Sequence, residues 1–156
     1  MVTPSVSGWE ALVDRFAAGP ALVRTAWAAS PAAARERPGL EGWSARDAVI
    51  HIADAELVRA YRIRIMCAGE ARIEAFDEDA WRVALAYGEG DPGIALALYE
   101  AVTASTVDLL RRLGEAAGSR SAPHPELGPI TVATLVERGI EHAAAHAAQV
   151  VELTGG

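Results

Sequence analysis

The sequence predicts an all-α fold, a four-helix bundle with one long crossover and a short extra helix. Alanine, the residue with the highest helix propensity, occurs 34 times among the 156 residues. Apolar residues recur at steps of three and four along the segments assigned to helices, which is the spacing of one helix face. No segment carries a clear strand pattern, and no internal repeat is visible. A chain of this length fits one domain, so we expect residues 1–156 to form a single bundle domain.

The first helix is predicted to begin at Ser7-Gly8-Trp9-Glu10, because Ser-x-x-Glu is the pattern of a capping box. Gly19-Pro20 falls inside the helical pattern, so we expect a kink or break there and an end before Pro31. Residues 30–43 contain two prolines and two glycines, which predicts a connector with one helical turn at 32–35.

The second long helix is predicted to begin at Ser44-Ala45-Arg46-Asp47, a second cap signature, and to continue to Gly69. A short periodic piece at 76–87 predicts a short crossing helix. Asp91-Pro92 combines a capping carboxylate with proline at the first helical position, which predicts the start of a helix that reaches Leu113.

The last part of the chain is predicted to be a loop followed by the final bundle helix. Residues 114–129 carry three prolines and three glycines, which is typical of a loop. Thr131 is a suitable cap for a helix that runs to about Leu153 and is ended by Gly155-Gly156.

Composition and charge exclude several kinds of partner. The net charge is −7, the pI is about 5.1, and the arginines are scattered. The sequence therefore has no basic stripe that could neutralise the phosphates of a nucleic acid, so we expect no nucleic-acid partner. No apolar run approaches the ~20 residues of a membrane span. The single cysteine, Cys67, cannot form an internal disulfide, and the first ten residues lack the pattern of a signal peptide. We therefore expect a cytoplasmic protein that acts on a small molecule.

Two of the four histidines, His142 and His146, are spaced four residues apart in the final helix. Residues at this spacing lie on one helix face with Cβ atoms about 6 Å apart, so both imidazoles can bind one ion at about 2.1 Å. The spacing also arises easily by chance, and two histidines without a shared role are the simpler interpretation of the pair alone.

A third histidine changes this interpretation. His51 lies early in the second long helix, on the face that also carries Ala48, Ala55, Val58 and Ile65 and is expected to point into the bundle. A lone core histidine is usually structural. Three histidines from two facing helices instead match a three-ligand metal site that leaves one position for water.

Four segments in combination resemble the DinB/YfiT-like superfamily, over about residues 8–153. They are Gly-Trp-Ser-x-Arg-Asp-x-Val-x-His-x-x-Asp-x-Glu at 42–56, Phe-Asp-Glu-Asp-Ala-Trp at 76–81, His-Pro-Glu-Leu-Gly-Pro at 124–129 and His-x-x-x-His-x-x-Gln at 142–149. The resemblance implies a four-helix bundle with a metal site of three histidines. His51, His142 and His146 occupy the positions of those ligands. Imidazole ligands suit zinc and nickel, which we expect as the divalent metal.

Five further residues are weaker site candidates. Gln149 could orient a ligand histidine or bind a substrate, or be a buried amide satisfied by the backbone. Asp54 could accept the far ring N–H of a ligand histidine, although a solvated carboxylate is the simpler interpretation. Arg62 and Arg138 could attract an anionic substrate, although arginines more often reach the surface. His124 could be a mobile fourth ligand or an acid–base group, although a surface histidine is simpler.

A divalent ion held by three neutral imidazoles lowers the pKa of bound water to about 7 or deprotonates a bound thiol. The resemblance implies the thiol chemistry in several branches, with bacillithiol, mycothiol or glutathione as the activated thiol. Our first hypothesis is therefore a metal-dependent thiol S-transferase acting on small electrophiles, with bacillithiol or mycothiol as co-substrate. No glutamate stands between the paired histidines as in His-Glu-x-x-His, so no dedicated general base is predicted, which weighs against protease-like hydrolysis.

Two alternatives remain open at this point. One is a metal-dependent hydrolase that uses metal-bound hydroxide, and the other is a non-catalytic, stress-related bundle with a structural or vestigial metal site. Members of the resembled family are often dimeric, and the alanine-rich helices have narrow apolar faces. We therefore expect a homodimer.

Overall fold

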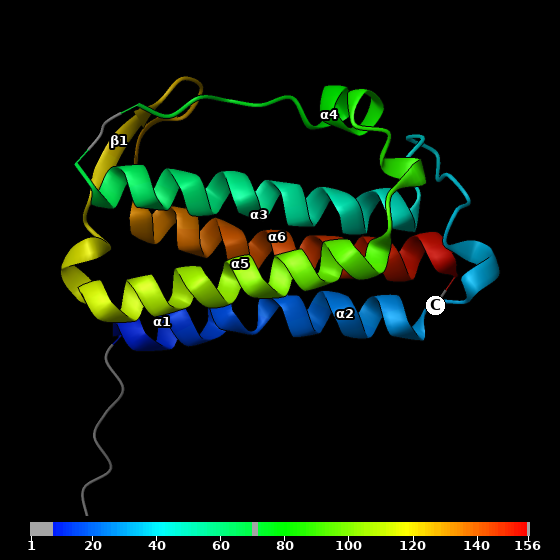
Figure 1. The fold of residues 1–156 in the computed structure, drawn as a ribbon, viewed down its shortest axis with the longest axis horizontal. Helices are drawn as coiled ribbons and strands as arrows, with labels where there is room; N and C mark the ends of the chain where they lie inside the picture. The colour runs from blue at the N-terminus through cyan, green and yellow to red at the C-terminus, as the bar shows by residue number, and fades with distance from the viewer. Residues whose placement is uncertain (1–7, 70–71, 156) are drawn as a thin grey trace, which may run out of the picture.

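The computed structural model describes residues 8–69 and 72–155, and in it four helical rods form a bundle (Figure 1). The first rod consists of two helices in line, and each of the other three is one long helix. The prediction of an all-α four-helix bundle is confirmed. The helices of the rods are α1 (Gly8–Ala17) and α2 (Gly19–Ala29), then α3 (Ala45–Cys67), α5 (Pro92–Leu113) and α6 (Val132–Thr154).

The first rod is broken where the sequence predicts it. Helix α2 begins at Gly19 with Pro20 in its first turn, and no helix crosses Ala18 without interruption. A Cβ atom on Gly19 would lie 2.7 Å from the hydroxyl oxygen of Tyr99, so glycine lets the first rod approach α5 closely at the break. Ser7, the predicted cap of the first helix, lies outside the described residues.

The predicted capping box at the start of α3 is confirmed. The Ser44 side chain accepts a hydrogen bond from the backbone N–H of Asp47, and the Asp47 carboxylate accepts one from the backbone N–H of Ser44 at 2.9 Å. Both groups are buried, so the reciprocal pair sets where α3 begins. The turn of α3 that carries His51 follows directly.

The crossover between α3 and α5 runs back along the bundle and carries the short helix α4 (Glu78–Ala84) and the 3₁₀ turn η2 (Tyr87–Glu89) (Figure 1). The predicted crossing helix at 76–87 is therefore shorter than expected. Ala86 takes a left-handed backbone conformation with φ of 50°, which ends the helical run before Tyr87. Trp43 Nε1 donates a hydrogen bond to Asp79 Oδ1 at 2.8 Å, which ties α4 to the chain just before α3. A second 3₁₀ turn, η1 (Ala32–Ala34), follows α2 as predicted.

The prediction of a loop at 114–129 is wrong in part, because this region holds the 3₁₀ turn η3 (Glu115–Ala117) and a β-hairpin. Strand β1 (Ser121–His124) pairs antiparallel with β2 (Gly128–Thr131). Ala122 and Ile130 face each other across the pair and are buried in the core. Strands of four residues that contain prolines show almost no alternation of apolar and polar residues in the sequence. The hairpin is stabilised by the burial of this facing pair.

The core consists of two apolar clusters, one at each end of the bundle. One gathers around Phe16, Ile63 and Leu110, and the other around Val23, Ile52 and Val150. Between them α3 and α5 place a polar layer of buried side chains, formed by Glu56, Thr103 and Thr106. The histidines of the candidate site lie beside this layer.

Among the described helices, only α5 has the length and hydropathy of a possible membrane span. It packs against α1, α2 and α3, and its buried face includes Leu96, Tyr99 and Leu110. The apolar composition of α5 is therefore accounted for by its place in the bundle core.

Candidate metal centre

His51, His142 and His146 come together between α3 and α6. His51 lies in the second turn of α3, and the other two lie one turn apart on α6, which packs beside α3. The Nε2 atom of His142 lies 3.1 Å from Nε2 of His51 and 2.8 Å from Nε2 of His146. All three residues offer a ring nitrogen within 4.8 Å of the others. The fold thus brings the three histidines together as one cluster of nitrogen donors.

The chemistry of this cluster fits a divalent transition metal. Ligand nitrogens about 2.1 Å from a tetrahedral ion lie about 3.4 Å from one another, so small side-chain rotations bring these three to that spacing. The three imidazoles come from two helices and would fill three positions of a tetrahedral site. Among the described residues no other His, Cys, Asp or Glu joins the group, so a further position is left for a small ligand.

Gln149 fixes the orientation of one ring. Its Oε1 lies 2.7 Å from Nδ1 of His146, one turn earlier on α6. A carboxamide oxygen only accepts, so the His146 ring carries its proton on Nδ1 and turns the lone pair of Nε2 toward the other histidines. Nδ1 of His51 and Nδ1 of His142 are buried and have no hydrogen-bond partner in the described part of the chain.

The protein environment keeps all three rings neutral, as metal ligands must be. Burial, followed by repulsion from His146 and Arg59, lowers the pKa of His51 to about 4. Burial, again followed by these two neighbours, lowers the pKa of His142 to about 2, and burial also lowers that of His146. At neutral pH the lone pairs are free to bind a cation.

Glu78 faces the cluster, although no local pattern in the sequence marks it as a site residue. The short helix α4 brings its Oε2 to 3.5 Å from Nε2 of His51. Burial and the neighbours Asp79 and Asp77 raise the pKa of this carboxyl above its ordinary value. Glu78 lies within one of the segments that carry the family resemblance, but its position over the histidines depends on the path of the crossover. Periodicity within a seven-residue helix does not reveal that path.

Asp54 and His124 have surroundings other than those that the sequence suggested. The Asp54 carboxylate accepts a hydrogen bond from the Tyr87 hydroxyl at 2.8 Å. It does not accept the Nδ1–H of His51, which has no hydrogen-bond partner in the described part of the chain. His124 ends strand β1 and is 9% exposed, so it is not a surface histidine. Its Nδ1 accepts a hydrogen bond from the Glu126 backbone N–H at 3.2 Å, and it is outside the group of converging histidines.

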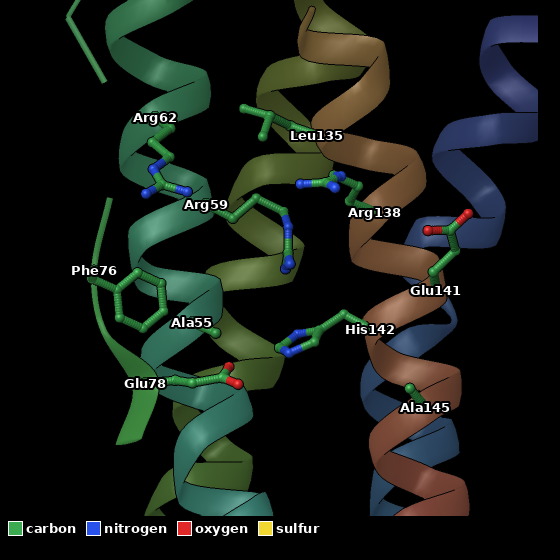
Figure 2. Close-up of a pocket in the computed structure, with 10 residues that line it drawn as sticks. All are labelled: Ala55, Arg59, Arg62, Phe76, Glu78, Leu135, Arg138, Glu141, His142 and Ala145. Carbon is green, nitrogen blue, oxygen red and sulfur yellow. The ribbon is translucent and has the colours of Figure 1, made fainter. Parts of the chain in front are cut away.

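A cavity of about 400 Å³ opens beside His142, between α3, α6 and the segment that leads into α4. Figure 2 shows Arg59, Arg138 and Glu78 directed toward the gap between α3 and α6 that holds the His142 ring, whereas the Arg62 guanidinium lies over α3 on the side of Phe76. Arg62 and Arg138, both weak candidates from the sequence, line this cavity together with Arg59. The histidine centre is thus accessible to a small molecule from one side.

Arg59 also pairs with a buried carboxylate in the bundle interior. Its guanidinium forms an ion pair with Glu56, whose side chain is fully buried in the polar layer. Burial raises the pKa of Glu56, while the charge of Arg59 acts in the opposite direction. Removing either partner would leave the other charge without its compensation next to the metal site.

Comparison with known proteins gives a consistent result. YfiT from Bacillus subtilis (strain 168), described as a probable metal-dependent hydrolase with an unusual four-helix bundle topology, is 29% identical over 115 residues, which are 72% of this chain and 65% of YfiT. The aligned sequence thus spans just under two thirds of that relative. The solved structure of YfiT superimposes with a TM-score of 0.86 at 25% identity, over 98% of this chain and 90% of YfiT.

A second solved structure shares the fold at lower identity. It is a mycothiol-dependent maleylpyruvate isomerase, with a TM-score of 0.75, 18% identity, and coverage of 96% of this chain and 63% of the isomerase. At this identity the likeness concerns the fold alone. The sequence pattern of the DinB superfamily, in contrast, matches residues 15–150, which is most of the chain. The chain belongs to the DinB superfamily.

Proposed function

We propose that this protein is a metal-dependent hydrolase whose single metal is held by His51, His142 and His146. The observation that carries the proposal is the carboxylate of Glu78, whose Oε2 lies 3.5 Å from Nε2 of His51 and which lines the same cavity as His142. Three neutral imidazoles and one adjacent carboxylate are the parts that metal-assisted hydrolysis requires.

A divalent ion at such a site lowers the pKa of a water or thiol that it binds, so that a nucleophile is available at neutral pH. Glu78 is placed to accept the proton that the attacking water loses and to return it to the leaving group. The absence of a His-Glu-x-x-His motif is therefore no argument against hydrolysis, because the acid–base group comes from another element of the fold.

The ligand helices contribute the remaining features. Gln149 holds the His146 ring with Nε2 toward the centre, and the capping box at Ser44 sets the start of the helix that carries His51. The cavity beside His142 has room for a small substrate, and Phe76 and Leu135 provide apolar walls. Zinc and nickel are the metals that best suit a set of imidazole ligands without thiolates.

A thiol S-transferase is the second candidate. It is supported by the shared fold with a mycothiol-dependent maleylpyruvate isomerase and by the same open position among the histidines. A thiol such as bacillithiol or mycothiol would be activated without help from a carboxylate, because a coordinated thiol loses its proton directly. The role of Glu78 is therefore the difference between the two candidates.

One experiment separates the candidates. Protein purified without chelator or metal-affinity resin is first examined by elemental analysis, and is then compared in metal-loaded and chelated form on a panel of small esters and amides. The same preparations are tested for conjugation of bacterial low-molecular-weight thiols to monochlorobimane. Metal-dependent hydrolysis supports the proposal, and metal-dependent conjugation without hydrolysis favours the transferase. If neither reaction exceeds that of buffer with free metal although elemental analysis finds bound metal, the result favours a non-catalytic metal-binding bundle.

A further inference from the structure

The lining of the cavity beside the histidine centre contains more arginines than carboxylates. Three arginines line it, Arg59, Arg62 and Arg138, against the carboxylates of Glu78 and Glu141. In Figure 2 the Glu141 carboxylate lies on the far side of α6 from the gap, whereas the guanidinium groups of Arg59 and Arg138 lie within it. A divalent ion on the three neutral imidazoles would add to this charge.

Two of the three arginines have no carboxylate partner in the described part of the chain. Arg59 is engaged by the buried Glu56. Arg62 instead donates a hydrogen bond to the backbone carbonyl of Glu74, and its Cζ lies 5.9 Å from the centroid of the Phe76 ring. No ion pair or hydrogen bond joins Arg138 to another residue in the part of the chain that the structure describes. The hydrogen bond to Glu74 therefore holds Arg62 in place. The other N–H donors of Arg62 and those of Arg138 remain available to a ligand.

Burial, followed by the charges of the three arginines, lowers the pKa values of groups beside the cavity. Burial and the charge of Arg59 lower the pKa of Arg62, which is half-buried. Burial, and then the charge of Arg62, lower the pKa of His124, and Arg138 acts in the same direction. Arg62 and Arg138 thus both lie close enough to His124 of the hairpin to affect its pKa, and both line the cavity, although they come from different helices.

Such a cavity offers guanidinium donors to an anion. Holding the charge of the half-buried Arg62 near another guanidinium costs free energy, and an anion that accepts hydrogen bonds from Arg62 and Arg138 reduces that cost. Arginine is the residue best suited to this task, because its planar donors match the oxygens of a carboxylate or phosphate.

We propose that Arg62 and Arg138 form a subsite for an anionic group, a carboxylate or phosphate, carried by the small molecule on which the protein acts. The proposal rests on the proposed function in one respect: an anion anchored there places the rest of the molecule beside His142 and Glu78. Anion binding itself needs no metal, so the subsite and the hydrolase function can fail separately.

The test uses metal-free protein at pH 7.5, where coordination of the anion to a metal does not contribute and the histidines are neutral. Binding of succinate, inorganic phosphate and the neutral analogue succinamide is measured by isothermal titration calorimetry, with the amide spectrum recorded by NMR. The variants are Arg62→Gln and Arg138→Gln. Arg112→Gln is the matched control, because Arg112 is exposed on α5, paired with Asp108, and distant from the cavity.

We expect at least one of the two anions to bind, succinamide not to bind, and each cavity variant to weaken binding by about tenfold or more. The Arg112→Gln protein should bind like the unaltered protein, and chemical-shift changes should concentrate at the cavity. Preference for succinate over phosphate assigns a carboxylate substrate, and the reverse assigns a phosphorylated one. Failure of both anions to bind, or equal weakening by all three variants, overturns the proposal. Arg138 is exposed, so its variant keeps the test valid if Arg62→Gln fails to fold.

Discussion

The Oε1 atom of Gln149 lies 2.7 Å from Nδ1 of His146, and this contact fixes which nitrogen of the ring faces the metal centre. Gln149 is the only glutamine in the chain. It is half-buried on the same face of α6 as the histidine that it orients. Variants of Gln149 can therefore show whether metal affinity depends on the orientation of the ligand histidines as well as on their presence.

Replacing Gln149 with Leu should lower the affinity for zinc or nickel by about 10- to 100-fold, because the His146 ring loses the acceptor that sets its tautomer. Competition with a chromophoric chelator measures the change. Gln149→Glu is the matched control, since a carboxylate accepts the same hydrogen bond and should retain most of the affinity. Equal affinities of the Leu variant and the unaltered protein would show that the contact does not tune the site.

His142→Ala should abolish stoichiometric metal binding while leaving the bundle folded. The variant removes one of three ligands, and alanine is favourable in a helix, so metal affinity falls by about 100-fold or more with little effect on helix content. Elemental analysis and circular dichroism check the two halves of this prediction. His124→Ala is the control, because His124 lies outside the converging group. Full metal content in the His142 variant would contradict the assignment of the ligands.

Glu78→Gln should reduce the rate of metal-dependent hydrolysis by about 100-fold or more without loss of bound metal, because the amide cannot accept a proton from water. Steady-state kinetics and elemental analysis of the same preparation are compared. If the protein is a thiol transferase, conjugation of the thiol should be nearly unchanged in this variant. Loss of metal together with activity would instead make Glu78 a ligand.

The metal-free protein should become less stable as the pH falls below 6.5. The pKa of His51 is about 4 in the folded chain and about 6.5 in the unfolded chain, so the unfolded state binds the proton first as the pH falls. As the pH falls from the unfolded to the folded pKa of such a histidine, the free energy of unfolding decreases by up to about 1.4 kcal/mol per pH unit. Above pH 6.5 these histidines are neutral in both states and cause no change of stability with pH.

Urea unfolding at pH 7.5 and pH 5.0 in the presence of chelator measures this loss of stability. The His51→Gln variant should lose less stability between the two pH values, since one of the titrating groups is gone. An equal loss in both proteins would mean that His51 does not titrate as its burial indicates.

A homodimer stays a prediction, and the exposed apolar side chains on α3 offer a place to test it. Leu57 and Tyr61 are 43% and 64% exposed and lie beside Val102 of α5. Burying them against a second copy would remove apolar surface from water. Light scattering at micromolar concentration should give a dimer that Tyr61→Arg shifts toward the monomer, while Ile94→Arg, at another exposed apolar position, has no effect. A monomer at all accessible concentrations would disprove the prediction.

The long helices could be predicted because their signals are local. The capping box at Ser44, the proline after Asp91 and the break at Gly19-Pro20 each depend on neighbours within a few residues. The convergence of the three histidines could also be anticipated, since the faces of two long helices follow from their periodicity. These features need no knowledge of how distant segments meet.

The features that could not be predicted depend on contacts between distant segments. The hairpin at 121–131 is stabilised by burial of its side chains against helices, which its short, proline-containing strands do not reveal. The position of Glu78 depends on the path of the crossover and on the Trp43–Asp79 hydrogen bond. Arg59 was missed because its pairing with a buried glutamate three residues earlier resembles an ordinary exposed helix pair in sequence.

The separation of His51 from His142 by 91 positions has a consequence for folding. An ion shared by these residues would tether α3 to α6 and close a loop that includes α4, α5 and the hairpin. The unfolded chain cannot hold that loop closed without a large loss of entropy, so the ion should bind the native state far more tightly than the unfolded state. By mass action, the melting temperature should then rise with the concentration of free metal, and the ion would act as a reversible cross-link between the two halves of the chain.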